Sequence, residues 1–359
     1  MSNSLQLHTF HESKGARFDG GAAVERVLEY GDVAREYAAL TAAAGLFDRS
    51  GRGKLRVTGG ERTSFVHGMV TNDVNGLKDG QATYAAMITV KGKMVADVRI
   101  SRRQDDLLLD VEPGVAPAAA EFLNHFLISE DAEIADVTEA LGLLSFIGPR
   151  ATECLAAVLG GTRPTLEINE LDERTFDGAP LTLVGTRLTS APGLDVILPA
   201  EKLEAFAHAA LEKGGPLGLS LVGFSAMEIA RVEAGIPRFG QDMTEETIPL
   251  EANLESAISY TKGCYVGQEV IARVHYRGHV NRKLTGLIFD DGAPVPAGTA
   301  LFKTPGDPRP SGTVTSALTS PARPGVLALG YVRRELLVPG TTLVTLEGRA
   351  ARVTALPFA

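Results

Sequence analysis

The sequence predicts an α+β protein with antiparallel sheets and a C-terminal all-β domain, and three observations carry this prediction. Short β-rich runs follow one another across turns with single helices between them, which is the order of an α+β chain and not of a doubly wound parallel sheet. No glycine-rich dinucleotide or phosphate-loop fingerprint stands where a strand would lead into a helix. After residue 281, proline and glycine become frequent between short β runs, as in a small barrel or sandwich.

The first part of the chain mixes predicted strands and helices. Thr83–Thr89 and Met94–Ile100 are separated by Lys91-Gly92-Lys93 and are predicted to form a hairpin. Helical periodicity over Val24–Leu46 predicts a helix there. The other predicted strands are Lys54–Val57, Leu107–Val111, Ala132–Val137, Leu143–Ile147, Leu181–Val184 and Asp195–Leu198. The other predicted helices are Glu61–Met69, Pro117–Leu127, Ala151–Leu159 and Glu201–Glu212.

The last part of the chain has a different pattern, and we place a domain boundary near residue 281. Its short β runs are Leu284–Phe289, Gly312–Ala317, Val326–Val332 and Thr342–Leu346. Residues 1–281 are then expected to form the α+β core, and residues 282–359 a β-barrel domain. A chain of 359 residues is longer than one typical core, so two or three domains are expected.

Composition predicts an ordinary globular protein of the cytoplasm. No stretch approaches the roughly 20 apolar residues that cross a membrane, and Met1–His11 lacks the apolar core of a signal peptide. The only two cysteines, Cys154 and Cys264, are far apart, so neither a disulfide framework nor a paired-cysteine metal clip is expected. With a net charge of −9 the chain as a whole repels the phosphate backbone of nucleic acids, and no stable nucleic-acid partner is predicted.

Cys264 stands in the most informative stretch, between Gly263 and Gly267 and two residues from Lys262. The following residues, Gln268–Tyr276, are predicted to be helical. A cysteine near a helix N-terminus and a lysine favours the thiolate over the thiol. Such a thiolate could be a nucleophile, a redox-sensitive group or a soft metal ligand. The alternative is a cysteine that packs under the loop.

Positive side chains gather around this cysteine in an otherwise acidic chain. Against the single acid Glu269, the segment carries Lys262, Arg273, Arg277, Arg282 and Lys283. A local basic patch suits a small anionic ligand or a negatively charged partner. His275 and His279 lie four residues apart, but Gly278 between them weakens a helical pair, and one cysteine cannot complete a structural metal site. No metal site is predicted.

The run Lys262-Gly263-Cys264-Tyr265-Val266-Gly267-Gln268-Glu269 resembles the signature of the YgfZ family, a branch of the glycine-cleavage T-protein or aminomethyltransferase superfamily. In T-proteins an acidic residue stands where this chain has Cys264. The resemblance to the superfamily extends over nearly the whole chain, with matching segments in the expected order. These segments are Gly45–Ser50, Val70–Val74, Arg231–Gly235, Gly240–Met243, Ala328–Val332 and Pro357-Phe358.

The resemblance implies a cloverleaf of three domains around a central opening that holds a tetrahydrofolate or a one-carbon derivative of it. Residues 1–281 would contain two interleaved α+β subdomains. Asp97 matches the carboxylate that lies beside the folate nitrogen involved in one-carbon transfer, and a buried carboxylate there could move a proton. The implied catalytic residues are Cys264 and Asp97. The implied folate-binding residues are Tyr84, Asp97, Asp195, Arg231 and Lys262.

Several of these residues also have a purely structural interpretation. Tyr84 could be a packing residue between neighbouring strands, and Asp97 an exposed strand-end residue. Asp195 matches a glutamate that reads the pterin in T-proteins, but its side chain is one methylene shorter. Arg231 could form a structural ion pair with a neighbour such as Glu228 or Glu233 instead of contacting a ligand.

Three functions follow from the resemblance. A YgfZ-like protein would bind tetrahydrofolate and support the assembly or repair of iron–sulfur client proteins, which can include tRNA-modifying enzymes, with Cys264 as its reactive group. The second is a folate-dependent aminomethyltransferase. Against it stand Cys264, Ala96 in place of the first of two acidic residues, and Met227 in place of an arginine of T-proteins. The third is a folate-binding module without chemistry.

Overall fold

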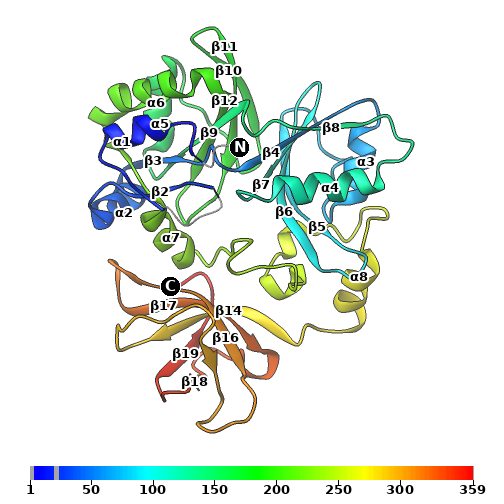
Figure 1. The fold of residues 1–359 in the computed structure, drawn as a ribbon, viewed down its shortest axis with the longest axis vertical. Coiled ribbons are helices and arrows are strands. Elements are labelled where there is room, and N and C mark those ends of the chain that lie inside the picture. The colour runs from blue at the N-terminus through cyan, green and yellow to red at the C-terminus, as the bar shows by residue number, and fades with distance from the viewer. Residues whose placement is uncertain (1–3, 20–23, 359) are drawn as a thin grey trace.

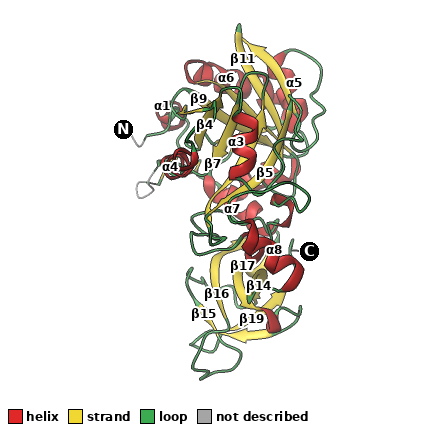
Figure 2. Ribbon diagram, turned by 90° about the vertical axis from the view of Figure 1, so that its right-hand side faces the viewer, coloured by secondary structure: helices red, strands yellow, loops and turns green. Residues whose placement is uncertain are grey.

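The computed structural model describes residues 4–19 and 24–358. The chain forms three lobes, and the third, C-terminal lobe lies below the other two in Figures 1 and 2. One lobe is built on a five-stranded antiparallel sheet in the order β5-β6-β7-β4-β8. Its strands are β4 (Gly53–Thr58), β5 (Gln81–Ile88), β6 (Met94–Arg102), β7 (Leu107–Val111) and β8 (Glu133–Asp136). Its helices are α3 (Arg62–Met69) and α4 (Ala116–Phe126).

The second lobe is built on a six-stranded sheet in the order β10-β11-β12-β9-β3-β13, in which only the β13–β3 pair is parallel. Its strands are β3 (Ala44–Asp48), β9 (Leu141–Ile147), β10 (Leu171–Phe176), β11 (Ala179–Thr186), β12 (Gly193–Pro199) and β13 (Leu219–Leu221). Its helices are α2 (Val33–Ala42), α5 (Ala151–Leu159), α6 (Ala200–Gly214) and α7 (Phe224–Glu233). All strands of the five-stranded sheet lie in sequence between β3 and β9.

The C-terminal lobe is a six-stranded antiparallel sheet in the order β15-β16-β17-β14-β19-β18. Its strands are β14 (Arg282–Phe289), β15 (Ala300–Leu301), β16 (Gly312–Ser320), β17 (Arg323–Arg333), β18 (Thr342–Val344) and β19 (Ala350–Thr354). Backbone hydrogen bonds of 2.7 and 2.8 Å between Phe302 and Val344 join its two edges, so the sheet closes on itself as a barrel. The expected α+β fold with antiparallel sheets and a C-terminal barrel is therefore confirmed.

The remaining elements connect these lobes. They are α1 (His8–Ser13), β1 (Arg17–Phe18), β2 (Val27–Glu29), α8 (Gln268–Arg277) and the short 3₁₀ segments Gly215–Leu217, Pro249–Ala252, Glu255–Ala257 and Arg334–Leu336. None of the helices in the described part of the chain has both the length and the apolar character needed to span a bilayer. Cys154 is buried inside α5 among apolar side chains.

The five- and six-stranded sheets face each other across a small apolar cluster. Its buried members come from both sheets and are Ala82, Leu108, Leu141, Leu143, Val184 and Ile197. A β-bridge between Gln81 and Glu170 adds a backbone link between the edge strands β5 and β10. Because apolar contacts hold only part of this interface, the polar side chains beside them are also removed from water and need partners.

The predicted hairpin is present, with β5 and β6 paired so that Ala86 lies opposite Asp97. The predicted helix over Val24–Leu46 is wrong, because this segment contains β2, α2 and β3. Gly31 adopts φ 93°, which breaks the periodic run, and the Asp32 side chain then accepts a hydrogen bond of 3.0 Å from the Arg35 N–H at the start of α2. At Gly45 a Cβ would lie 2.7 Å from Leu40, so β3 packs against the preceding helix instead of extending it.

Candidate functional site

Charged side chains occupy the face of the five-stranded sheet that looks toward the six-stranded sheet. In the strand register, neighbouring residues form a row that runs Tyr84, Arg99, Asp110 and Lys54. Asp97 lies two residues before Arg99 on β6, so its side chain points to the same face. The alternation of polar and apolar residues along β6 is therefore what brings Asp97 and Arg99 into one site.

Asp97 differs from the other residues of this face because it is buried and one of its carboxylate oxygens has no hydrogen-bond partner in the part of the chain that the structure describes. Its side chain is buried, with 7% of the residue exposed. Oδ2 accepts a hydrogen bond of 2.8 Å from the Tyr84 hydroxyl, whereas Oδ1 is buried and has no partner in the described structure. Burial, and to a lesser extent the nearby Glu112 carboxylate, raise the pKa of Asp97 to about 6, although Arg52 opposes the shift. Asp97 can therefore change protonation state near neutral pH.

Asp195, on the facing strand β12, is held by two residues of its own lobe. Arg49 Nη1 donates to both carboxylate oxygens at 2.9 and 2.8 Å, and the Ser145 hydroxyl donates to Oδ1 at 2.6 Å. A carboxylate has about four acceptor positions, so little of its capacity is left for a ligand. The structure thus places Asp195 opposite the sheet that carries Asp97, but as the partner of Arg49.

Asp110, on β7, forms a second ion pair between the two sheets. Arg52 Nε donates to it at 2.5 Å, and Arg49 Nη2 lies 3.6 Å away. Burial alone would raise the pKa of Asp110, but Arg52 and Arg49 outweigh this effect and hold it below its usual value. Asp110 is therefore a permanent anion at neutral pH, in contrast to Asp97.

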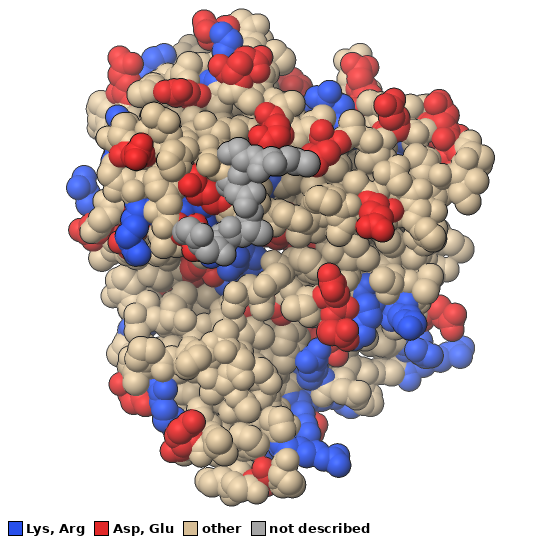
Figure 3. Space-filling view, in the orientation of Figure 1, with Lys and Arg blue, Asp and Glu red and all other residues tan. Residues whose placement is uncertain are grey.

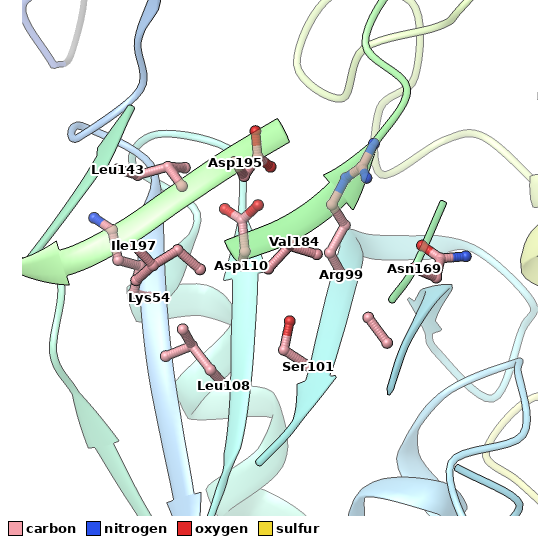
Figure 4. Close-up of a pocket in the computed structure, with 11 residues that line it drawn as sticks. Lys54, Arg99, Ser101, Leu108, Asp110, Leu143, Asn169, Val184, Asp195 and Ile197 are labelled. Atoms are coloured by element: carbon pink, nitrogen blue, oxygen red, sulfur yellow. The ribbon is translucent and has the colours of Figure 1, made fainter. Parts of the chain in front are cut away.

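A small cavity of about 20 Å³ lies between the two sheets (Figure 4). Its polar lining residues are Lys54, Arg99, Ser101, Asp110, Asn169 and Asp195, and its apolar ones are Ala82, Leu108, Leu143, Val184 and Ile197. This volume has room for about one water molecule. The bulk of any larger ligand of this site would therefore lie outside the cavity.

Lys54 is a buried lysine that no motif singles out. It is 1% exposed, and its ammonium donates to the backbone carbonyls of Ser50 at 2.8 Å, Arg52 at 2.9 Å and Thr138 at 3.4 Å. Burial lowers its pKa to about 8, against the attraction of Asp110 and other acids. These bonds fix the turn between β3 and β4, which carries Arg49 and Arg52 into the site.

Replacing Lys54 by methionine is expected to lower the free energy of unfolding by about 1–3 kcal/mol. The methionine side chain fills the same space, but the buried carbonyls of Ser50 and Arg52 lose their donor. Urea unfolding followed by circular dichroism measures the change. Lys78→Met, at an exposed loop position, is the control and should leave stability unchanged. Equal stability of the wild-type and Lys54→Met proteins would contradict the assignment.

Arg231 lies at the contact between α7 and the barrel, away from Asp97. Nε and Nη2 donate to the Glu228 carboxylate at 2.9 and 2.8 Å, and Nη1 donates to Asp242 and to the Ile236 carbonyl, both at 2.6 Å. Nη2 also donates to the Ser316 hydroxyl at 3.1 Å. All five N–H groups are used, so the structural ion pair that the sequence left open is what the structure shows, and no donor is presented to a ligand.

Lys262 is also committed to the backbone. Its ammonium donates to the carbonyls of His67, Val70 at 2.7 Å and Asn72 at 2.9 Å, at the end of α3, and it lies 4.9 Å from the centre of the Tyr265 ring. Burial lowers its pKa to about 8. These three bonds use all three ammonium protons, so Lys262 anchors the cysteine loop to α3 and offers no free donor to a ligand.

Cys264 is exposed and unpaired, on the irregular loop just before α8. The predicted helix over Gln268–Tyr276 is confirmed, because α8 spans Gln268–Arg277. Gly267 precedes it with φ 80°, and a Cβ there would lie 2.4 Å from the carbonyl oxygen of Thr89. The loop therefore packs closely against the β5–β6 hairpin, the same hairpin that carries Asp97.

The basic patch around Cys264 is partly neutralised in the fold. Arg282 pairs with Glu251 at 3.2 Å and Lys283 with Glu255 at 2.8 Å. Arg273 on α8 is exposed, and Lys and Arg side chains gather over α8 and the start of β14 (Figure 3). Among the described residues no three histidine, cysteine, aspartate or glutamate side chains come together as a metal site.

The structure thus brings together Tyr84 and Asp97, and places Asp195 on the facing sheet. Arg231, Lys262 and Cys264 lie elsewhere, at the barrel contact and at the junction of α3 and α8. Sequence reasoning missed the charged residues between the two sheets that accompany Asp97 and Asp195, which are Arg49, Arg52, Lys54, Arg99, Asp110 and Glu112. The signal that could have found the ones on strands is a charged residue at alternate positions of an otherwise apolar strand, as at Asp110 in β7.

Family comparisons agree with this architecture. Residues 7–262 match the GCVT N-terminal domain, and residues 282–359 match the glycine cleavage T-protein C-terminal barrel domain. An aminomethyltransferase of Pelodictyon phaeoclathratiforme is 30% identical over 98% of this chain and 97% of its own length. An aminomethyltransferase of Symbiobacterium thermophilum is 32% identical over 100% of this chain and 98% of its own length.

A solved structure is also similar to this chain over its whole length. The crystal structure of glycine cleavage system aminomethyltransferase T from Bartonella henselae superposes with a TM-score of 0.90 at 28% sequence identity. The match covers 99% of this chain and 98% of the other. The likeness therefore extends over all three lobes and the order of their elements.

Proposed function

Because the chain belongs to the glycine cleavage T-protein family, we propose that it binds a tetrahydrofolate and that Asp97 exchanges a proton with a nitrogen of that ligand during one-carbon transfer. The observation that carries this proposal is the unpartnered Oδ1 of Asp97. A buried carboxylate oxygen without a hydrogen bond is costly, and a ligand N–H placed against it would remove that cost. Bound tetrahydrofolate would supply the nitrogen that accepts the one-carbon unit.

The residues around Asp97 suit a proton-transfer role. Tyr84 holds the other carboxylate oxygen at 2.8 Å and so fixes the orientation of the group. A pKa of about 6 keeps both protonation states accessible at neutral pH, which is the condition for efficient general acid–base catalysis. The aromatic ring of Tyr84 also offers a flat apolar surface beside the carboxylate, against which a ring of the ligand could pack.

The relatives favour aminomethyl transfer as the reaction. Two curated proteins similar over their whole length, and the Bartonella henselae structure, are aminomethyltransferases. The test is an assay with an aminomethyl-lipoyl carrier protein and tetrahydrofolate, in which folate-dependent turnover supports the proposal. Turnover that equals the rate without the protein would exclude this reaction.

A second candidate, the YgfZ-type role in assembly or repair of iron–sulfur proteins, is favoured by one specific observation. Cys264 is exposed on a loop that Lys262 and Gly267 hold in place, which makes its thiol accessible to a partner protein. The differences from T-proteins at Ala96 and Met227 point the same way. Met227 is buried in an apolar cluster in α7 and offers no charge to a substrate.

Cys264→Ala is expected to abolish rescue of iron–sulfur enzyme activity in a strain that lacks the corresponding gene, while the purified variant keeps its fold. Cys154→Ala is the matched control, because Cys154 is buried, and should rescue like the wild type if the variant is stable. Normal rescue by Cys264→Ala would remove the cysteine from this function. Aminomethyl transfer without any rescue by the wild type would leave the T-protein reaction as the function.

A further inference from the structure

We propose that Arg99 is a ligand-binding residue of the folate site, which donates hydrogen bonds to an oxygen of the ligand. This inference rests on the proposed function, because it assigns a contact to the same ligand. It names a residue that neither the sequence motifs nor the family match singled out. The ligand oxygen is either the pterin carbonyl or a carboxylate of the glutamyl tail, which share the chemistry of accepting from a guanidinium.

The first argument is that three arginines, Arg49, Arg52 and Arg99, lie between the two sheets but are not paired equally. Arg49 is paired with Asp195 at 2.8 Å, and Arg52 with Asp110 at 2.5 Å. For Arg99, no carboxylate lies within ion-pair distance in the described part of the chain. Its one hydrogen-bond partner there is a neutral hydroxyl, Thr186 Oγ1, at 2.7 Å from Nη1.

The second argument is the position of the Arg99 guanidinium. Arg99 is partly buried and lines the cavity between the sheets, and burial lowers its pKa. Figure 4 shows its guanidinium pointing away from Lys54 and Asp110. None of its nitrogens is both buried and unpartnered, so its unused N–H groups remain accessible. A desolvated cation without a direct counterion gains most from an acceptor that arrives from outside.

The third argument is the geometry relative to Asp97. The two residues are i and i+2 on β6, so their Cα atoms lie about 6–7 Å apart and both side chains point to one face. Tyr84, opposite Arg99 on the neighbouring strand β5, contacts both residues: its hydroxyl donates to Asp97, and its ring centre lies 5.8 Å from the Arg99 guanidinium carbon. The site therefore presents an acceptor and a donor beside one aromatic ring. A ligand with an N–H and an oxygen acceptor at similar spacing fits both.

The experiment measures binding by calorimetry for the wild type, Arg99→Met and Arg99→Lys. The ligands are 5-formyltetrahydrofolate, which carries the glutamyl tail, and 6-methyltetrahydropterin, which lacks it. Arg102→Met is the matched control, because Arg102 lies on the same strand, points to the other face and pairs with Asp79 at 2.9 Å. Circular dichroism verifies that each variant is folded.

Arg99→Met is expected to weaken binding of 5-formyltetrahydrofolate by about 10- to 100-fold, the usual loss for a hydrogen bond to a charged group. Arg99→Lys, which keeps the charge but loses the planar fork, should weaken it less. If 6-methyltetrahydropterin loses affinity in parallel, the acceptor is the pterin oxygen. If only the folate does, the acceptor is a glutamyl carboxylate.

The inference is overturned if folded Arg99→Met binds 5-formyltetrahydrofolate as tightly as the wild type, or if Arg102→Met loses as much affinity as Arg99→Met. These outcomes differ from a failure of the proposed function, in which the wild-type protein itself would bind neither ligand.

Discussion

The Asp97→Asn variant is expected to lose about 10²- to 10⁴-fold of the rate of folate-dependent transfer, the usual contribution of a positioned general acid or base. Asparagine has nearly the same shape and can keep the contact with the Tyr84 hydroxyl, but its amide cannot accept or release a proton near neutral pH. Single-turnover kinetics with tetrahydrofolate and the carrier protein measure the loss. Retention of wild-type rates in a folded Asp97→Asn protein would contradict the role of Asp97.

The pH dependence gives this prediction a second readout. Burial raises the pKa of Asp97 to about 6, so the wild-type rate should change near that pH: a reaction that needs the carboxylate as base falls as the pH decreases through 6. In Tyr84→Phe the ionised form loses a hydrogen bond, which should raise the pKa of Asp97 and move the change to higher pH. In Asp97→Asn the change should disappear.

The raised pKa of Asp97 also makes the stability of the protein depend on pH. The folded-state pKa of Asp97 lies above its ordinary value of 3.8, so the folded protein holds this proton more tightly than the unfolded chain. The stability that comes from this proton is therefore present below pH 3.8 and is lost as the pH rises to about 6. At neutral pH the ionised, buried carboxylate lowers the free energy of unfolding. Asp97→Asn is accordingly expected to be at least as stable as the wild type at pH 7.

Replacing Arg231 by methionine is expected to have the largest effect on stability, about 3–5 kcal/mol, the usual loss when one partner of a buried ion pair is removed. Arg231 is 6% exposed and joins α7 to Asp242, whose side chain is fully buried, and to Ser316 of the barrel. Without the guanidinium, Asp242 keeps neutral donors from Ser316 and Thr315 but has no counterion among the residues that the structure describes.

Urea unfolding of the Arg231→Met variant should be followed by circular dichroism, because the chain has no tryptophan. Lys283→Met is the control: Lys283 is also a residue of the barrel, but its ion pair with Glu255 is exposed, and such pairs contribute about 0–1 kcal/mol. A loss below 1 kcal/mol for Arg231→Met would mean that the barrel is held by other contacts. A large effect on folate affinity in a stable protein would restore Arg231 as a ligand residue.

The sequence predicts the elements well where local signals are strong. Helix α5 and strand β7 have the predicted limits, and the β5–β6 hairpin follows from two β-rich runs around Gly92. It fails over Val24–Leu46, where apolar spacing suggests a helix but Gly31 and the packing of Gly45 on Leu40 divide the segment. Positive φ values and close contacts depend on tertiary structure, so periodicity alone does not show them.

The candidate site also combines features that the sequence predicts with features that only the tertiary structure determines. Asp97 and Tyr84 were predicted from a resemblance and lie together because a hairpin pairs their strands. The partner of Asp195 was not predicted, because Arg49 lies 146 residues away in sequence and comes close only because β3 and β12 both pair with β9 in the same sheet. For Arg231 the sequence offered both a ligand contact and an ion pair with Glu228. Only the placement of Asp242 and the barrel around it decides between them.

The central claim is that the unpartnered oxygen of Asp97 receives a folate nitrogen, and the most direct test is calorimetric titration of the wild-type and Asp97→Ala proteins with 5-formyltetrahydrofolate at pH 7.5. The account predicts saturable one-site binding to the wild type, and about 10- to 100-fold weaker binding after the carboxylate is removed, as for a charge-assisted hydrogen bond. Equal affinity of the two proteins, or a wild type that binds no folate, would contradict it.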